Sequence, residues 1–135
     1  MLNYSLILFI QSQFVEEDFM TVSDIKNLLN ASVLCCENHL EKEVHTACGS
    51  DMMSDVLAFV KDQSVLLTGL CNPQVVRTAE MMDIICICFV RGKEPDENVI
   101  SLAEEKGIVL LQTDLRMFPA CGVLYNNGLH GGAEN

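Results

Sequence analysis

The stretch from Val65 to Glu80, VLLTGLCNPQVVRTAE, decides how the rest of the chain is interpreted. A short apolar run ends at Thr68-Gly69, and Asn72-Pro73 then supplies an N-cap and a first-turn proline for a helix. A strand that passes through a tight turn into a helix aims backbone N–H groups at one point, as α/β folds do when they bind anions and nucleotides. The sequence therefore predicts a strand–turn–helix unit whose turn is a candidate ligand site.

Strands and helices also alternate on both sides of this unit. The patterns predict strands at residues 32–36, 44–47, 65–67, 84–90 and 108–112, and helices at residues 21–30, 51–60, 73–82, 95–106 and 118–127. Such alternation favours βαβ units, so the expected class is α/β, a three-layer domain with a mainly parallel sheet of about four to five strands flanked by helices. We expect the domain to cover residues 20–129, with residues 1–19 as an N-terminal extension and 130–135 as a disordered tail.

Three local expectations concern the ends and faces of these helices. Asp51 is expected to open the helix that follows Gly49-Ser50, and its apolar spacing predicts one buried face. The members of that face are Met53, Val56, Leu57 and Val60. Because proline breaks a hydrogen bond in a helix interior, Pro119 places the start of the last helix near Phe118.

Composition narrows the class of partner. The chain has 19 acidic and 8 basic residues and a formal net charge of -11, which repels phosphate backbones and anionic lipid surfaces. We therefore expect neither nucleic acid nor membrane as a partner. The apolar run Leu6 to Ile10 is too short to cross a bilayer. The role of residues 1–19 stays open between a start-site extension, an edge strand and a small partner-binding segment.

The seven cysteines predict free thiols and a cytoplasmic location, because their spacing forms neither a CxxC pair nor a disulfide framework. Cys86 and Cys88 alternate within IICICFV and are expected to pack inside the sheet. The histidines show no ligand spacing toward these thiols, so no metal and no cofactor are predicted. Cys48 and Cys71 lie near strand ends, but His45 falls on the opposite face of an extended segment from Cys48, which argues against a catalytic pair.

Candidate site residues follow from the topology, because ligands of parallel sheets bind beyond the carboxyl ends of the strands. The residues at those ends are Gly49, Ser50, Asp51, Thr68, Gly69, Leu70, Asn72, Arg91, Gly92 and Thr113. Gly69 permits close approach of the backbone to a phosphate, and we expect the amide hydrogens at this rim to be available to a ligand. Asp51 and Arg91 can equally be an ordinary helix-start carboxylate and a solvated arginine.

Four pieces of the chain resemble the stand-alone DRTGG domain family: GSDMMSDVLAFV, VLLTGLCNPQVVRTAEMMDI, FVRGKEPDENVISLAEEKGIVLL and MFPACGVLYNNGL. The resemblance covers Met20 to about Leu129, with TGLCNP in place of the name-giving motif. It implies a fold like the N-terminal domain of HPr kinase/phosphorylase. The same domain stands beside the catalytic domain of some phosphotransacetylases and beside CBS domains in certain pyrophosphatases, where it regulates or dimerises.

The resemblance thus implies a non-catalytic homodimer that senses a nucleotide or a phosphorylated metabolite. The chain contains no GxxxxGK[ST] string, so intrinsic kinase activity is not expected, and no catalytic residues are predicted. Two alternatives stay open. One is an interaction or scaffold subunit that binds a metabolic enzyme through its Met- and Cys-rich helices. The other is a small phosphate-handling enzyme.

Overall fold

The computed structural model describes residues 19–61 and 63–132, and their centre is a five-stranded sheet. Its strands are β2 (Ser32–Cys35), β4 (Thr46–Gly49), β5 (Ser64–Thr68), β6 (Ile84–Phe89) and β7 (Val109–Gln112). They lie in the order β2-β7-β6-β5-β4, with β4 to β7 parallel and β2 antiparallel to β7. The predicted α/β class with a mainly parallel sheet is therefore confirmed.

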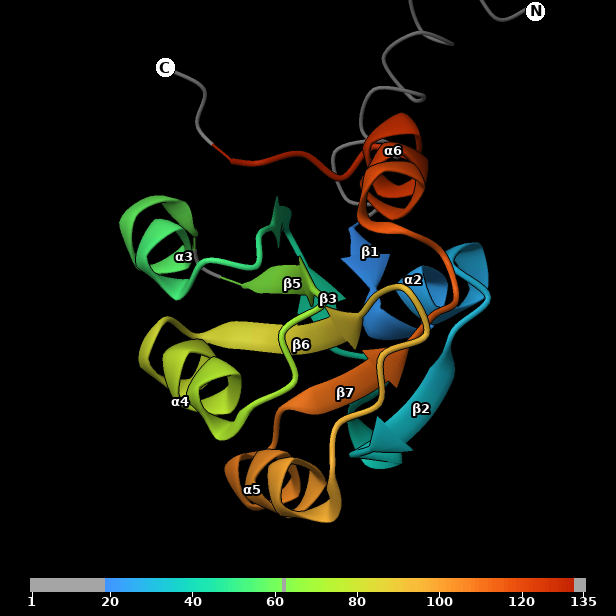
Figure 1. Ribbon diagram of the computed structural model, residues 1–135. Helices are drawn as coiled ribbons and strands as arrows, with labels where there is room; N and C mark the ends of the chain where they lie inside the picture. The colour runs from blue at the N-terminus through green and yellow to red at the C-terminus, as the bar shows by residue number, and fades with distance from the viewer. Residues whose placement is uncertain (1–18, 62, 133–135) are drawn as a thin grey trace, which may run out of the picture.

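Helices cover both faces of this sheet, which gives the predicted three layers. Helices α3 (Met53–Phe59), α4 (Pro73–Met81) and α5 (Glu97–Lys106) follow one another along one face, whereas α2 (Val22–Leu28) and α6 (Met117–Asn126) cover the other (Figure 1). The parallel connections from β4 to β7 all advance in one direction, so their crossover helices fall on the same side. No helix within the described ranges is long and apolar enough to span a membrane.

The predicted extended piece at residues 44–47 is divided between two sheets, which corrects that expectation. Strand β3 (Glu43–Val44) pairs with β1 (Met20–Thr21) in a small antiparallel sheet, whereas β4 pairs with β5. His45 lies between them, and its ring stacks on Phe19 with the centroids 4.3 Å apart. The segment is divided because Val44 pairs with β1 and Thr46 pairs with β5. A short apolar pattern does not predict which strand each residue pairs with.

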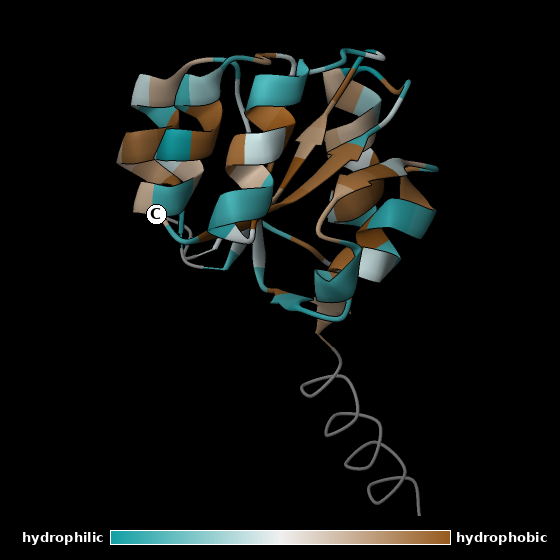
Figure 2. Ribbon diagram, turned by 90° about the horizontal axis from the view of Figure 1, so that it is seen from below, coloured by the Kyte–Doolittle hydropathy of each residue, from teal (hydrophilic) through white to brown (hydrophobic). Residues whose placement is uncertain are grey.

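The hydrophobic core lies between the sheet and its two helix layers. All five residues of β5 are buried, as are most of β6 and β7, and Figure 2 shows strands coloured as hydrophobic between helices that carry both hydrophilic and hydrophobic residues. Cys86 and Cys88 are fully buried, which confirms their predicted place inside the sheet. Burial raises the pKa of the Cys88 thiol to about 12, so this side chain packs as a neutral hydrophobe.

The structure corrects the predicted start of α3 and agrees with the predicted start of α6 near Phe118. Helix α3 begins at Met53, so Asp51 lies in the preceding loop, and Leu57 is 44% exposed instead of buried because α3 is short and lies near the β4 edge. Helix α6 begins at Met117 and contains Pro119 in its first turn. Proline is tolerated there because the first-turn N–H groups have no partner within the helix.

The ordered contacts of the chain continue beyond the predicted domain boundary at residue 129. Leu129 is buried, and the His130 carbonyl oxygen accepts a hydrogen bond of 2.9 Å from the Ala47 amide at the edge of β4. The His130 ring also lies 4.2 Å, centroid to centroid, from Tyr125 of α6. Residues 1–18, most of the predicted N-terminal extension, and residues 133–135 lie outside the described ranges.

Candidate functional site

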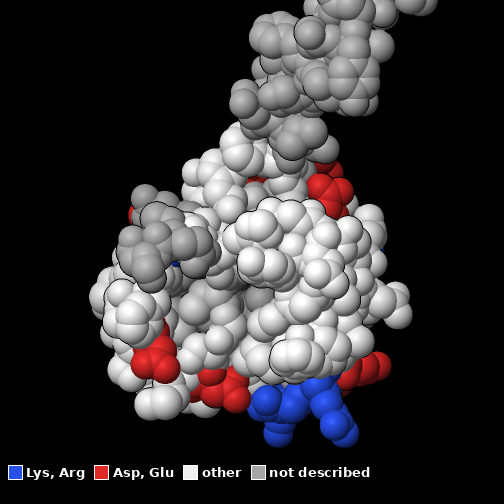
Figure 3. Space-filling model, turned by 90° about the horizontal axis from the view of Figure 1, so that it is seen from above, with Lys and Arg blue, Asp and Glu red and all other residues white. Residues whose placement is uncertain are grey.

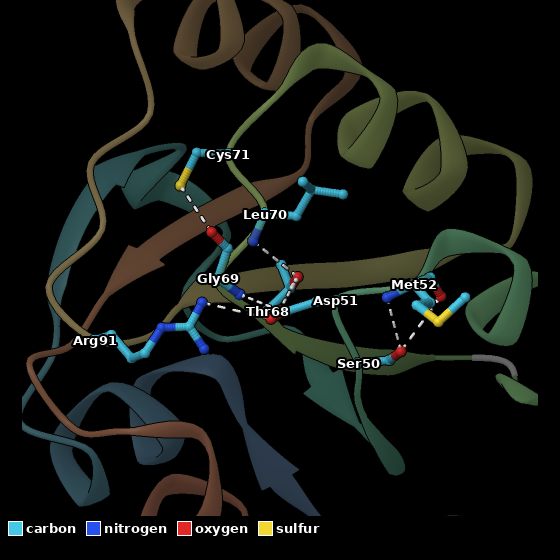
Figure 4. A network of polar contacts seen from close by, with 8 residues as sticks. All are labelled: Ser50, Asp51, Met52, Thr68, Gly69, Leu70, Cys71 and Arg91. Atoms are coloured by element: carbon cyan, nitrogen blue, oxygen red, sulfur yellow. Dashed lines mark hydrogen bonds and ion pairs between the residues drawn. The ribbon is translucent and has the colours of Figure 1, made fainter.

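The Asp51 carboxylate joins three loops at the C-terminal ends of β4, β5 and β6 (Figure 4). Its Oδ1 accepts hydrogen bonds from the Gly69 backbone N–H at 2.7 Å and from the Thr68 hydroxyl at 3.1 Å. Its Oδ2 lies 3.4 Å from Nη2 of Arg91. An amide, a hydroxyl and a guanidinium therefore converge on one anionic group, which we call the strand-tip network.

Backbone pairing places these residues together. The Ser50 amide donates to the Leu67 carbonyl oxygen at 3.0 Å, so the pairing of β4 with β5 continues one step beyond the strand and brings Asp51 beside Thr68. The Val90 amide donates to the Thr68 carbonyl oxygen at 3.0 Å, which in the same way brings Arg91 beside Gly69. The network is thus a direct consequence of the parallel register, as expected for residues at the carboxyl ends of neighbouring strands.

Gly69 makes the close approach of Arg91 possible. A Cβ added at Gly69 would overlap the Arg91 guanidinium group. Any other residue at this position would displace the flexible arginine head, so glycine permits this contact between Gly69 and Arg91 through its lack of a side chain. The group that approaches Gly69 in the structure is thus the Arg91 side chain, and the predicted approach of a phosphate stays a prediction.

The network keeps the Asp51 carboxylate ionised. Its pKa is lowered from the ordinary value of 3.8, above all by the hydrogen bond from the Gly69 amide; burial opposes this as the next largest effect, and Thr68 and Arg91 lower the pKa further. The Asp51 and Arg91 side chains are 46% and 39% exposed, so the pair is open to solvent and is screened by salt.

The amide hydrogens at this rim are already engaged, which corrects the expectation that they are available to a ligand. The Gly69 amide donates to Asp51, and the Leu70 amide donates to the Thr68 hydroxyl oxygen at 3.1 Å. The physical reason is proximity. Because Asp51 lies in the loop before α3, its carboxylate is close enough to accept from the Gly69 amide. The sequence signal for this was weak, since an aspartate just before a helix usually serves that helix.

The remaining candidates take other places. Ser50 adjoins the network, and its hydroxyl accepts a hydrogen bond from the Met52 amide at 3.0 Å. Thr113 is 2% exposed and donates to the Leu29 carbonyl oxygen at 2.7 Å, which is a structural contact. The Gly92 amide donates to the Thr113 carbonyl oxygen, and Asn72 is exposed without a side-chain capping bond.

Two cavities lie away from the network and were not foreseen. The larger, about 620 Å³, is bordered by described residues within 19–28, 44–45 and 127–129. The smaller, about 140 Å³, lies between β4 and α6, and Gly49 lines it. Sequence reasoning missed both because their walls come from segments far apart in the chain. Within the described ranges, no group of three or more His, Cys, Asp or Glu residues is placed to hold a metal ion.

The fold and the network define a small α/β domain with a polar cluster at its strand tips, and the comparisons place it in a family. Residues 24–124 match the model of the DRTGG domain, and the chain belongs to the DRTGG domain family. A search among curated proteins found no match.

A solved structure shares this fold. It contains the CBS and DRTGG domains of the regulatory region of Clostridium perfringens pyrophosphatase, complexed with the activator diadenosine tetraphosphate. The TM-score is 0.62 and the sequence identity 15%, over 77% of this chain and 45% of the other. The chain thus spans less than half of the regulatory region that it resembles.

Proposed function

We propose that this DRTGG domain is a non-catalytic regulatory module that binds a nucleotide or a phosphorylated metabolite at the C-terminal ends of its strands. The observation that carries the proposal is the convergence of Thr68, Gly69 and Arg91 on a single carboxylate. These three donors already hold an anion, and a guanidinium beside a backbone amide suits phosphate oxygens as well as carboxylate oxygens.

Local charge supports an anionic ligand despite the acidity of the chain. Arg91 and Lys93 are both close enough to the neighbouring Cys71 to oppose the rise of its pKa, which burial causes first. Two cations thus lie at the rim of a protein whose formal net charge is -11. Asp51 opposes these two cations at Cys71, so the rim attracts an anion to the extent that their charge exceeds that of this carboxylate.

The regulatory assignment draws on the family and on the resembling structure. A DRTGG domain occurs in the regulatory region of a pyrophosphatase whose structure holds a nucleotide activator, and we extend that setting to this chain as part of the proposal. The sequence offers no GxxxxGK[ST] loop for phosphoryl transfer. Its seven free thiols agree with a reducing, cytoplasmic environment.

A thermal-shift and calorimetry panel tests this function. The ligands are ATP, AMP, diadenosine tetraphosphate and acetyl phosphate, and the proteins are wild type, Arg91→Ala, Arg77→Ala and Asp51→Ala. A bound ligand raises the melting temperature. Loss of a charge-assisted contact costs about 1.5–3 kcal/mol, so Arg91→Ala is expected to weaken binding by at least roughly 10-fold.

Arg77→Ala is the matched control, because Arg77 is exposed on α4 and its replacement removes the same charge outside the strand-tip network. Equal affinity of wild type and Arg91→Ala would place the ligand elsewhere and contradict the proposal. A flat response of both wild type and Asp51→Ala across the panel would also contradict it. Asp51→Ala is included because the Asp51 carboxylate occupies the Thr68 hydroxyl and the Gly69 amide in wild type.

We further propose that the module is a homodimer that associates through α6. This helix contains no charged residue, and its Phe118 and Tyr125 are 88% and 60% exposed. Figure 3 shows the face over α6 as largely uncharged, with the visible Lys and Arg side chains gathered in one place. Two copies that each carry a charge of -11 associate with least repulsion through such a face. A metabolic enzyme is the alternative partner for the same surface.

A further inference from the structure

We propose that Asp51 is a built-in competitor for the strand-tip site, so that an anionic ligand binds only by displacing its carboxylate. This inference rests on the proposed function of the same site and adds a regulatory device to it. A single carboxylate oxygen, Oδ1, accepts from both the Gly69 amide and the Thr68 hydroxyl, and Oδ2 faces Arg91. Asp51 thus occupies the position that a ligand's anionic oxygens would take.

Displacement requires little rearrangement. Asp51 lies in the loop before α3, and its side chain is 46% exposed, so rotation about its side-chain bonds can bring the carboxylate into water. Water then replaces the hydrogen bonds that the carboxylate gives up. Since neither β4 nor α3 has to move, exchange between Asp51 and a ligand is a local event at the surface.

The loops keep their places without the carboxylate. Backbone hydrogen bonds from Ser50 to Leu67, from Val90 to Thr68 and from Gly92 to Thr113 hold the three strand ends in register. The Gly69 amide and the Thr68 hydroxyl therefore keep their places when Asp51 turns away, whereas the position of the Arg91 head depends on its flexible side chain. This distinguishes a competitor from a structural clasp, since removal of a clasp would scatter the donors and abolish binding.

Competition also selects among ligands. A monocarboxylate offers the same charge and the same oxygens as Asp51 but without its high local concentration, so it cannot compete effectively. A phosphoryl group carries up to two negative charges and three oxygens, which can contact the amide, the hydroxyl and the guanidinium at once. The site would thus respond to phosphates and ignore common carboxylates, with a threshold set by Asp51.

The test is a calorimetric titration of inorganic pyrophosphate, with acetate as the carboxylate probe, into wild type, Asp51→Ala, Asp55→Ala and Arg91→Ala. Removal of the competitor is expected to tighten pyrophosphate binding by roughly 10-fold, the size of one charge-assisted contact. Asp55 is exposed in the first turn of α3, so Asp55→Ala removes the same charge without touching the donors. Its effect measures general electrostatics, and the gain from Asp51→Ala must exceed it.

The outcomes separate the two proposals. Suppose that wild type binds pyrophosphate and Arg91→Ala weakens this binding, but Asp51→Ala increases the affinity no more than Asp55→Ala does. The inference that Asp51 competes with the ligand is then overturned, and the proposed function stands. If neither wild type nor Asp51→Ala binds, both fail. Should Asp51→Ala not fold, an NMR titration of the wild-type protein with pyrophosphate tests the inference. If pyrophosphate displaces the Asp51 carboxylate, the pKa of Asp51 returns toward its ordinary value and the Gly69 amide resonance shifts. An unchanged Asp51 pKa under saturating pyrophosphate would overturn the inference.

Discussion

The role that the sequence predicts for Asp51 differs from the role that the structure shows. In the sequence it stands before an apolar helical pattern and is read as the start of that helix. In the structure it lies in the loop and contacts the next two strand ends along the sheet. The local signal failed because hydrogen bonds from residues 17, 18 and 40 positions away outweigh a helix-start preference of about 1 kcal/mol.

The lowered pKa of Asp51 predicts a pH dependence of stability. A carboxyl whose folded pKa lies below its unfolded value stabilises the fold above the unfolded value, 3.8, and loses that contribution as pH falls through the folded pKa. Wild type should therefore melt above Asp51→Asn at neutral pH, and the gap should close below about pH 4. Thermal melts of both proteins from neutral pH to about pH 2 measure the gap. A gap independent of pH would show that the carboxylate charge contributes no stability.

At the scale of elements, the starts of helices α4 and α5 also differ between what the sequence predicts and what the structure shows. Asp96 and Asn72 both precede a helix with extended backbone; the sequence predicted Asn72 as an N-cap but placed Asp96 inside its helix. The Asp96 carboxylate accepts from the Val99 amide at 3.1 Å, whereas the Asn72 side chain makes no capping bond. The sequence predicted where α4 begins, but the start of α5 at Glu97 and the capping bond of Asp96 are seen only in the structure.

This contrast predicts unequal costs of two matched substitutions. Asp96→Ala should lower the free energy of unfolding by about 1 kcal/mol, because it removes a formed cap from α5. Asn72→Ala should change it by less than about 0.5 kcal/mol, the usual range for a surface substitution. Urea denaturation of the two variants beside wild type measures both costs. Equal costs would mean that the Asn72 side chain caps α4 in solution.

Apolar periodicity predicted β2, β5, β6 and β7 and the α-helices that the structure describes, whereas the strand predicted at residues 44–47 is divided between β3 and β4. It was reliable for the buried runs of β5, β6 and β7, whose residues are apolar on both sides as a covered parallel sheet requires. It failed for Leu57, which matches the helical spacing but is 44% exposed. The spacing of apolar residues predicts which of them share a face of a helix. The buried fraction of that face depends on the elements that pack against the helix, and a short helix at the sheet edge has few of them.

The whole molecule presents unequal surfaces, and these carry the prediction about assembly. Helix α6 exposes Phe118 without any charge on the helix, while α3 exposes Phe59, at 69%, beside Asp55. If the homodimer forms through α6, Phe118→Glu should convert dimer to monomer, because it adds two buried charges to the interface. Phe59→Glu adds the same charge outside that face and should leave the dimer intact.

Light scattering coupled to gel filtration measures the mass of each protein. Halving of the mass by Phe118→Glu alone supports the α6 interface, and dissociation by Phe59→Glu alone would assign the contact to α3. A monomeric wild type at every concentration would contradict the homodimer and leave the face to another partner. Circular dichroism melts of both variants verify that each remains folded.

The sequence by itself determined the α/β class, the alternating elements and the set of strand-end residues, because burial patterns and helix signals are local and repeat along the chain. Only the tertiary structure decided that the pairing of β4, β5 and β6 brings Asp51, Thr68, Gly69 and Arg91 to one point, and that Asp51 fills it. Register and loop contacts join residues that no local pattern links. The physical reason is that a buried strand needs only apolar residues, whereas a site needs particular atoms within hydrogen-bonding distance.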